Sequence, residues 1–306
     1  MARFFYILLL VIVFLACEGT QQNDRPIVQI SLHSSDTLRS HILPEESNEP
    51  ISLAISAMTS PKETYIYYEK LVEYISQKLG RPIQFKQRKS YEEVNELLKK
   101  AVVDIAFICS GAYVSALPEN YMEIIAVPVI NNKAYYQAYI IVHKDSPYQQ
   151  FIDLKHKRFA LTDPLSNTGY YYPLRRVKEL GFTLDRFFSK TIFTYAHDYS
   201  IQAVARKLVD GASVDGLIFD YLAKNNPKLV ENLRVIEKSE PFGMPPIVVP
   251  RGLNPKLKEQ LQIVFLNLHR DPKGQQILSQ LNIDRFIRGD TVNYSGVLRN
   301  KRMAVP

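Results

Sequence analysis

Residues 163–173 read DPLSNTGYYYP and connect an apolar run at 158–161 to an amphipathic stretch at 170–180. The apolar run is typical of a buried strand, and the stretch after the turn has the spacing of a helix. The connection is short and rich in Ser, Asn, Thr and Gly, which is typical of a tight turn. A strand, a polar turn and a helix form the repeating unit of an α/β protein, and the chain on either side follows the same plan.

The start of this helix also has the chemistry of an anion site. Its first turn carries no Asp or Glu, so the exposed N–H groups and the positive end of the helix dipole are not neutralised by the helix itself. Ser166, Asn167 and Thr168 add donors, and Gly169 permits close approach to the backbone. An ordinary turn capped by Ser or Thr explains the same residues, and spacing alone leaves both interpretations open.

Strands and helices alternate from residue 51 onward, which predicts an α/β fold with mostly parallel sheets. Two helices begin with a capping-box pattern, at Ser60 with Glu63 and at Ser90 with Glu93. The predicted strands are 51–57, 83–87, 104–108, 123–130, 137–143, 158–161, 190–194, 216–218, 233–237 and 247–249. The predicted helices are 62–79, 91–100, 170–180, 199–207, 219–224, 255–269 and 272–281.

The composition excludes several classes of protein. Of the 306 residues, 46% are hydrophobic and 23% are charged, which is unlike a disordered chain. Two cysteines are too few for a disulfide scaffold. The formal charge of +7 is not gathered into a basic stripe, so we expect no nucleic-acid partner. We find no His and Cys spacing for a metal and no Gly-rich nucleotide loop, so we expect no metal and no cofactor.

The first 17 residues have the layout of a secretion signal. Arg3 precedes an apolar run at 4–16, which is too short to span a bilayer. The run ends at Ala16 and Cys17 and resembles a bacterial lipoprotein signal, in which that cysteine carries the lipid. A plain cleaved signal and an uncleaved anchor are the alternatives. Each of them places the protein on the periplasmic or cell-surface side of a bacterial membrane. Residues 18–50 are polar, predict a tether, and hold one candidate edge strand at 27–32.

Five segments resemble one family in the same order. Residues 163–173 resemble an Asp-Pro-x-Ser-x-(Ser/Thr)-Gly-Tyr-x-x-Pro element of the phosphonate-binding, PhnD-like family of periplasmic substrate-binding proteins, which serve ABC importers of phosphate, phosphite and phosphonates. The other segments are SPKETYIYYEKL at 60–71, DIAFICSGAY at 104–113, the stretch that begins with AHD at 196–198, and PPIVV at 245–249. The resemblance spans about residues 50–290.

The family implies a two-lobed periplasmic binding protein, type II-like, with two mostly parallel mixed sheets and a hinge. The expected divisions are a signal at 1–17, a tether at 18–50, lobe I at 51–143, lobe II at 144–244, and a return to lobe I with C-terminal helices at 245–306. A ligand would bind between the lobes, at the carboxyl ends of strands, and closure would bury it. We expect a monomer.

Site residues follow from the resemblance one at a time. The oxyanion turn corresponds to Ser166, Asn167, Thr168 and Gly169, although Asn167 replaces a usual Ser or Thr. The remaining ligand-binding expectations are Tyr91, Tyr136, His197 and Asp215, with Glu240 as a weaker match for a second acid. In phosphonate importers such acids contact a ligand amine, so Asp215 and Glu240 would suit a zwitterion.

Each of these residues also has an ordinary structural role open to it. The chain contains 19 Tyr, so packing in the core is an equally good explanation for either tyrosine, and Tyr135 and Tyr139 compete with Tyr136 for the match. Asp215 is well placed to cap a helix, and a lone His is often a satisfied core residue.

Cys109 stands at a strand end, in a position where many relatives have Gly or Pro, and Ser110 follows it. A free Cys is usually a small buried hydrophobe. A thiolate is instead a soft ligand, suited to an ion such as arsenite, and Ser110 would add a hydroxyl in either case. Cys109 and His197 would also be the only candidate pair for an enzyme. No catalytic signature surrounds them, so we expect no enzyme activity and no catalytic residue.

Two functions fit these features. The first is a lipid-anchored binding protein that captures a phosphonate-, phosphite- or phosphate-like oxyanion for an ABC permease. The second is a sensory subunit that reports an oxyanion such as arsenite to a histidine kinase. The sequence leaves the identity of the oxyanion open.

Overall fold

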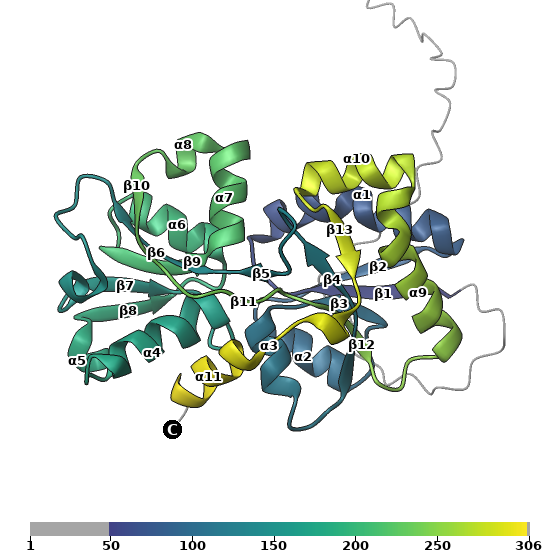
Figure 1. Ribbon diagram of the computed structural model, residues 1–306, viewed down its shortest axis with the longest axis horizontal. Coiled ribbons are helices and arrows are strands. Elements are labelled where there is room, and N and C mark those ends of the chain that lie inside the picture. Colours follow the sequence, from purple (N-terminus) through teal and green to yellow (C-terminus); the bar gives the residue numbers. More distant parts are fainter. Residues whose placement is uncertain (1–48, 305–306) are drawn as a thin grey trace, which may run out of the picture.

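The computed structural model describes residues 49–304, which fold into two lobes side by side (Figure 1). The predicted signal, Cys17 and the candidate strand at 27–32 lie outside the described residues. The first lobe contains a six-stranded sheet in the order β13-β4-β12-β3-β1-β2. Its strands are β1 (Ile51–Ile55), β2 (Ile83–Gln87), β3 (Ile105–Phe107), β4 (Met122–Val129), β12 (Ile247–Pro250) and β13 (Arg285–Ile287).

The second lobe contains a five-stranded sheet in the order β10-β6-β9-β7-β8. Its strands are β6 (Ala138–His143), β7 (Arg158–Leu161), β8 (Lys190–Phe193), β9 (Gly211–Asp215) and β10 (Leu233–Lys238). In both sheets the strands that helices connect run parallel, and the strands that cross between lobes run antiparallel. The expected α/β class with two mixed sheets is confirmed.

The lobes are joined by a short ribbon in which β5 (Tyr135–Tyr136) pairs antiparallel with β11 (Phe242–Gly243). We expected the first crossing after residue 143. The structure instead places β6 in the second sheet, between β10 and β9, so the chain crosses at β5. The predicted crossing was wrong because the apolar run of β6 fits the interior of either sheet, whereas the polar turn after it has the composition of a linker.

Helices cover both faces of each sheet. The first lobe has α1 (Pro61–Leu79), α2 (Tyr91–Lys99), α3 (Ser110–Ala116), α9 (Pro255–Asn267) and α10 (Pro272–Leu281). The second lobe has α4 (Tyr172–Glu179), α5 (Leu184–Phe187), α6 (His197–Ala205), α7 (Gly216–Asn225) and α8 (Pro227–Val230). Short helical turns are η1 (Phe151–Leu154), η2 (Asn167–Tyr171), η3 (Leu268–Arg270) and η4 (Gly289–Thr291), and α11 (Ser295–Ala304) ends the described chain.

Two local predictions were wrong. Residues 216–218 were expected to form a strand, but Asp215 ends β9 and caps α7, which begins at Gly216. Ser60 was expected to cap α1 with its hydroxyl, but its side chain makes no capping bond. The capping prediction at Ser90 is confirmed, because its hydroxyl accepts a hydrogen bond from the Glu93 N–H at 3.3 Å.

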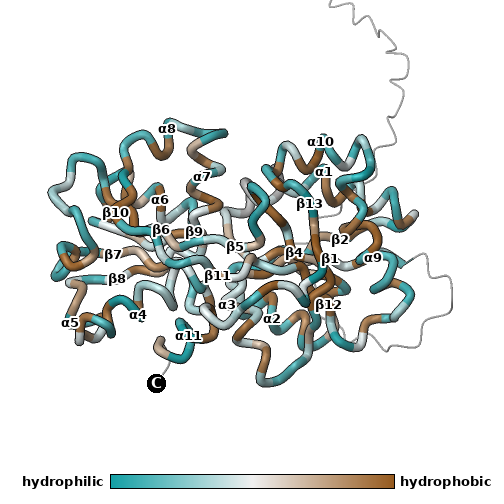
Figure 2. Tube along the Cα trace, viewed as in Figure 1, coloured by the Kyte–Doolittle hydropathy of each residue, from teal (hydrophilic) through white to brown (hydrophobic). Residues whose placement is uncertain are grey.

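Each lobe has its own apolar core, visible as the hydrophobic interior of both halves in Figure 2. In the first lobe α1, α9 and α10 pack on one face of the sheet, and α2 and α3 pack on the other. The Phe107 ring lies 5.0 Å from that of Tyr68 and 5.9 Å from that of Phe265. Burial of each such ring contributes about 1.5–3 kcal/mol.

The C-terminal helix α11 packs against α3 of the first lobe and against α4 and η2 of the second. We expected the whole of 245–306 to pack on the first lobe, and α9 and α10 do so. The physical reason for the difference is that Val297 joins a cluster that includes residues of both lobes, such as Val114 and Tyr172. Helix α11 therefore links the lobes beside the hinge (Figure 1).

Candidate functional site

The two lobes touch directly through backbone groups, which defines a closed arrangement. Besides the side-chain hydrogen bonds of Ser115 with Tyr171 and of Lys224 with Asn282, three hydrogen bonds from backbone N–H groups cross the boundary between them. They run from the Tyr91 N–H to the Asp163 carboxylate at 3.0 Å, from the Ser60 N–H to the Asp198 carboxylate at 2.9 Å, and from the His197 N–H to the Met58 carbonyl at 2.9 Å.

The two backbones approach each other closely at Gly111. An added Cβ there would lie 2.6 Å from the backbone nitrogen of Asn167 and would overlap the carbonyl oxygen of Leu165, both in the other lobe. Any side chain at position 111 would therefore hold the lobes apart.

The turn at 163–169 ends in a cap made by its own side chains. The Ser166 hydroxyl accepts a hydrogen bond from the Gly169 N–H at 2.9 Å, and the Asp163 carboxylate accepts one from the Leu165 N–H at 2.8 Å. The Gly169 N–H, which we expected to face a ligand, is thus bound within the turn. Gly169 is nonetheless required, because a Cβ would lie 2.5 Å from that of Thr162.

Besides the hydroxyl of the half-buried Ser146 after β6, three buried hydroxyls have no hydrogen-bond partner among residues 49–304, and all three are on fully buried residues. They belong to Ser56 after β1, Tyr91 at the start of α2, and Thr168 in η2. Buried hydroxyls without a partner are rare in folded proteins, because leaving one unpaired costs about 1–3 kcal/mol. They come from segments of both lobes that end at the boundary, so they are candidate donors to a ligand held there.

Cys109 lies beside these groups as a buried thiol. It packs with Tyr91 and Ala112 in one apolar cluster. Burial raises the pKa of the Cys109 thiol, and the backbone N–H of Asn167 only partly offsets that effect. The side chain is therefore a neutral thiol near pH 7, rather than the thiolate that a soft-ion site requires.

Tyr136 and Ser110 are paired to each other, with 2.6 Å between their hydroxyl oxygens. The Asn167 amide donates to the Tyr136 hydroxyl at 3.4 Å, and its own oxygen accepts a hydrogen bond from the Asn300 amide at 2.9 Å. This chain of side chains connects the hinge, both lobes and α11. Four of the buried groups near the boundary thus hold the closed arrangement together.

His197 and Asp215 are in direct contact. The Asp215 N–H donates to Nδ1 of His197 at 3.1 Å, so the ring proton is on Nε2. Burial lowers the pKa of His197 to about 3 and raises that of Asp215 to about 7. One Asp215 oxygen caps α7 by accepting a hydrogen bond from the Leu217 N–H at 2.8 Å. Asp215 and Tyr68 of the first lobe line one cavity, described below. Burial, and after it the charge of Asp215, raises the pKa of Tyr68.

Glu240 lies elsewhere. Its carboxylate is paired with Arg175 of α4 at 2.7 Å and with Arg299 of α11. Burial is the largest single effect and works to raise the pKa of Glu240, but the hydrogen bond from Arg175, a backbone hydrogen bond and the charges of Arg175 and Arg299 together lower that pKa. Glu240 does not line the cavity described next. This residue, expected as a second ligand-binding acid, instead forms ion pairs with helices α4 and α11.

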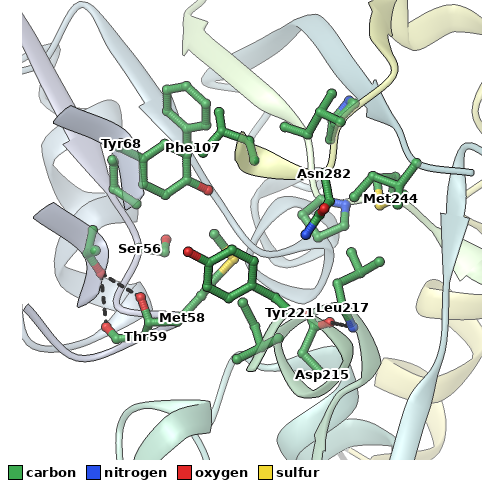
Figure 3. A pocket seen from close by; sticks show the side chains of 18 of the residues that line it. Ser56, Met58, Thr59, Tyr68, Phe107, Asp215, Leu217, Tyr221, Met244 and Asn282 are labelled. Atoms are coloured by element: carbon green, nitrogen blue, oxygen red, sulfur yellow. Dashed lines mark hydrogen bonds between the residues drawn. The ribbon is translucent and has the colours of Figure 1, made fainter. Parts of the chain in front are cut away.

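A cavity of about 320 Å³ lies between the lobes and borders this site. Its walls come from both lobes, and Figure 3 shows Tyr68 and Phe107 on one side and Asp215 and Leu217 on another. Most lining side chains are apolar. The charged ones are Asp198, Asp215, Asp220 and Lys224.

Sequence reasoning missed Ser56, Tyr68 and this cavity. Ser56 follows the first strand of the sheet, at the carboxyl end where open α/β sheets bind ligands, and that position is a usable signal. Tyr68 is one of many tyrosines on an amphipathic helix, and nothing in its spacing separates it from a core residue. Within residues 49–304 we find no cluster of His, Cys, Asp or Glu that could hold a metal, and no helix with the length and apolarity of a membrane span.

Comparison with known proteins identifies the family. The sequence profile described as "ABC transporter, phosphonate, periplasmic substrate-binding protein" matches residues 53–294. The chain belongs to this phosphonate-binding family. Members are the extracytoplasmic substrate-binding components of ABC transporters, which places this chain outside the cytoplasmic membrane and implies a permease partner.

Individual relatives agree with the family assignment. The phosphonates-binding periplasmic protein of Escherichia coli K12 is 26% identical over 256 residues, which are 82% of this chain and 75% of that protein. A binding component of a Pseudomonas aeruginosa ABC phosphonate transporter has the same fold, with a TM-score of 0.76 and 23% identity over 83% of this chain and 85% of that one. A Prochlorococcus marinus protein solved with methylphosphonate gives a TM-score of 0.75 and 18% identity, over 84% of this chain and 98% of that one. These relatives are transport components of the phosphonate-binding family, so a sensory subunit is not favoured.

Proposed function

We propose that this protein captures a phosphonate, phosphite or phosphate-like oxyanion between its two lobes and delivers it to an ABC permease. The observation that carries the proposal is the set of three buried, unpartnered hydroxyls of Ser56, Tyr91 and Thr168. An oxyanion accepts several hydrogen bonds at once, and a bond to a charged acceptor is worth about 1.5–3 kcal/mol. No chemical step is needed, because the ligand only has to bind the closed arrangement better than the open one.

The remaining expected residues support the site in two ways. The Asn167, Tyr136 and Ser110 side chains hold the lobes and the hinge in register. His197 and Asp215 lie on the second-lobe side, where a neutral imidazole offers its Nε2–H as a donor and the carboxyl group would meet a positively charged part of a ligand.

The test is binding of an oxyanion panel by the full-length chain, measured by calorimetry and by thermal unfolding. The panel contains methylphosphonate, phosphite, phosphate and sulfate. The decisive variant is Thr168→Val, which removes the hydroxyl at nearly constant volume. We expect about tenfold to a hundredfold weaker binding of the preferred anion. We expect no loss of stability without ligand, because Thr168 Oγ1 has no partner within the described protein.

Thr191→Val is the matched control, since Thr191 is a half-buried residue of β8 away from the boundary. A structural role for Thr168 would show as a lower unfolding midpoint with unchanged affinity, and that result would contradict the proposal. Absence of binding by every anion in the panel would also contradict it.

We further propose that Cys17 carries a lipid anchor, on the strength of the signal-like run that ends at Ala16. Labelled palmitate should enter the wild-type chain in a bacterial host and not the Cys17→Ser variant. Equal labelling of both chains would refute the anchor.

A further inference from the structure

The cavity beside the hydroxyls is larger and more apolar than a small inorganic anion or methylphosphonate needs. At about 320 Å³ it has room for about ten atoms of the size of a water molecule. Pockets of this size with mostly apolar walls are typical of organic ligands. The walls include the paired rings of Tyr68 and Phe107 and the thioethers of Met58 and Met244.

The charges in the cavity decide which part of a ligand enters it. Three aspartates line it against a single lysine, and the Lys224 ammonium is already bound to the side-chain oxygen of Asn282 in the other lobe. A phosphonate head placed there would meet like charges, so the head belongs with the hydroxyl donors. The part of the ligand that fills the cavity is neutral or positively charged.

The hydroxyl site and the cavity share one residue, Ser56. Ser56 contributes its unpartnered hydroxyl to the first and lines the second. Asp215 also lines the cavity and lies against His197 behind it. A ligand bound to Ser56 through its head would therefore direct its substituent between Tyr68 and Leu217 (Figure 3).

We propose, on the basis of the function above, that the preferred ligand is a phosphonate or phosphate monoester with an apolar aryl or alkyl substituent, and that the cavity binds this substituent. The substituent gains burial against the aromatic and aliphatic walls, which the methyl group of methylphosphonate provides only in small part. Specificity for the organic part of the ligand thus comes from the cavity, and affinity for the anion comes from the hydroxyls.

The experiment compares benzylphosphonate with methylphosphonate by calorimetry on the full-length chain. Complete burial of the added ring predicts about tenfold to 150-fold tighter binding for benzylphosphonate. It also predicts a more negative heat-capacity change, which is the marker of apolar burial.

Leu217→Trp tests the location, because Leu217 is a half-buried cavity wall and a larger ring would occupy the space. The ratio of the two affinities should fall toward one in this variant. Leu208→Trp is the matched control, since Leu208 is 61% exposed and is not part of the cavity wall. That variant should keep the wild-type ratio.

The outcomes separate this inference from the function on which it rests. If methylphosphonate binds and benzylphosphonate binds no better, the inference is overturned and the proposed function stands. If benzylphosphonate binds better but Leu217→Trp keeps the ratio, the assignment of the cavity is overturned. If neither phosphonate nor any anion of the panel binds, both proposals fall.

Discussion

Replacement of Asp215 by Asn should stabilise the protein at alkaline pH and leave its stability unchanged at acid pH. The Asp215 carboxyl is 3% exposed, and burial raises its pKa from 3.8 to about 7. Between these two values the unfolded chain ionises Asp215 while the folded chain keeps it protonated. The free energy of unfolding therefore falls as pH rises through this window, by about 1.4 kcal/mol for each pH unit. Over the window the loss reaches up to about 4 kcal/mol.

The Asn variant lacks this titration but keeps the acceptor that caps α7 at Leu217. The free energy of unfolding of the variant should equal that of wild type at pH 4 and should exceed it by as much as about 4 kcal/mol at pH 8. The assay is urea unfolding of both chains at pH 4, 6 and 8 without added anion, followed by circular dichroism. Asp290→Asn is the control, because the Asp290 side chain is 70% exposed and should change stability by less than about 0.5 kcal/mol at any pH. A stability difference at Asp215 that does not change with pH would refute the argument from burial.

Two further changes test the closed arrangement. Gly111→Ala should keep the fold of each lobe but hold the lobes apart. The radius of gyration of this variant in solution should therefore no longer decrease when the preferred anion is added. Gly252→Ala is the control and should behave as wild type, because an added Cβ there meets nothing within 4 Å. Asn300→Ala should lower the free energy of unfolding by about 1–3 kcal/mol, because it leaves the buried Asn167 oxygen without its partner, and an unchanged urea midpoint would count against the network.

The fold was largely predictable because the apolar runs have the lengths and spacings of their elements. The strands at 83–87 and 158–161 and the helix at 272–281 begin and end where the sequence indicates. The error at 216–218 has a local cause. Strand β9 reads GASVD, whose small and polar residues lack the β-branched pattern, so the pattern instead predicts a strand at the apolar start of α7. Membership of β6 in one sheet or the other depends on partners far away in the chain.

The sequence indicates candidate site residues where one short segment holds the signal, but it gives no indication of the cavity, which two lobes create together. Thr168 and Tyr91 follow from the turn and helix starts that resemble the family, and the structure leaves both hydroxyls unpartnered among the described residues. The cavity has no sequence signature, because its walls come from segments more than 200 residues apart. Glu240 forms ion pairs with arginines of α4 and α11, and no local sequence pattern predicts that pairing.

Under the proposed function, the buried polar groups connect closure to ligand capture. The closed arrangement contains three hydroxyls that the described protein does not pair and a carboxyl whose ionised form is disfavoured by burial. Each unpaired hydroxyl disfavours closure by about 1–3 kcal/mol, and an anion that accepts their hydrogen bonds removes that cost. The backbone bonds at Tyr91, Ser60 and His197 favour closure whether or not a ligand is bound. The unpaired hydroxyls and the backbone hydrogen bonds therefore have opposite effects on closure. Ligand binding needs to contribute only the difference between their free energies to shift the population toward the closed form.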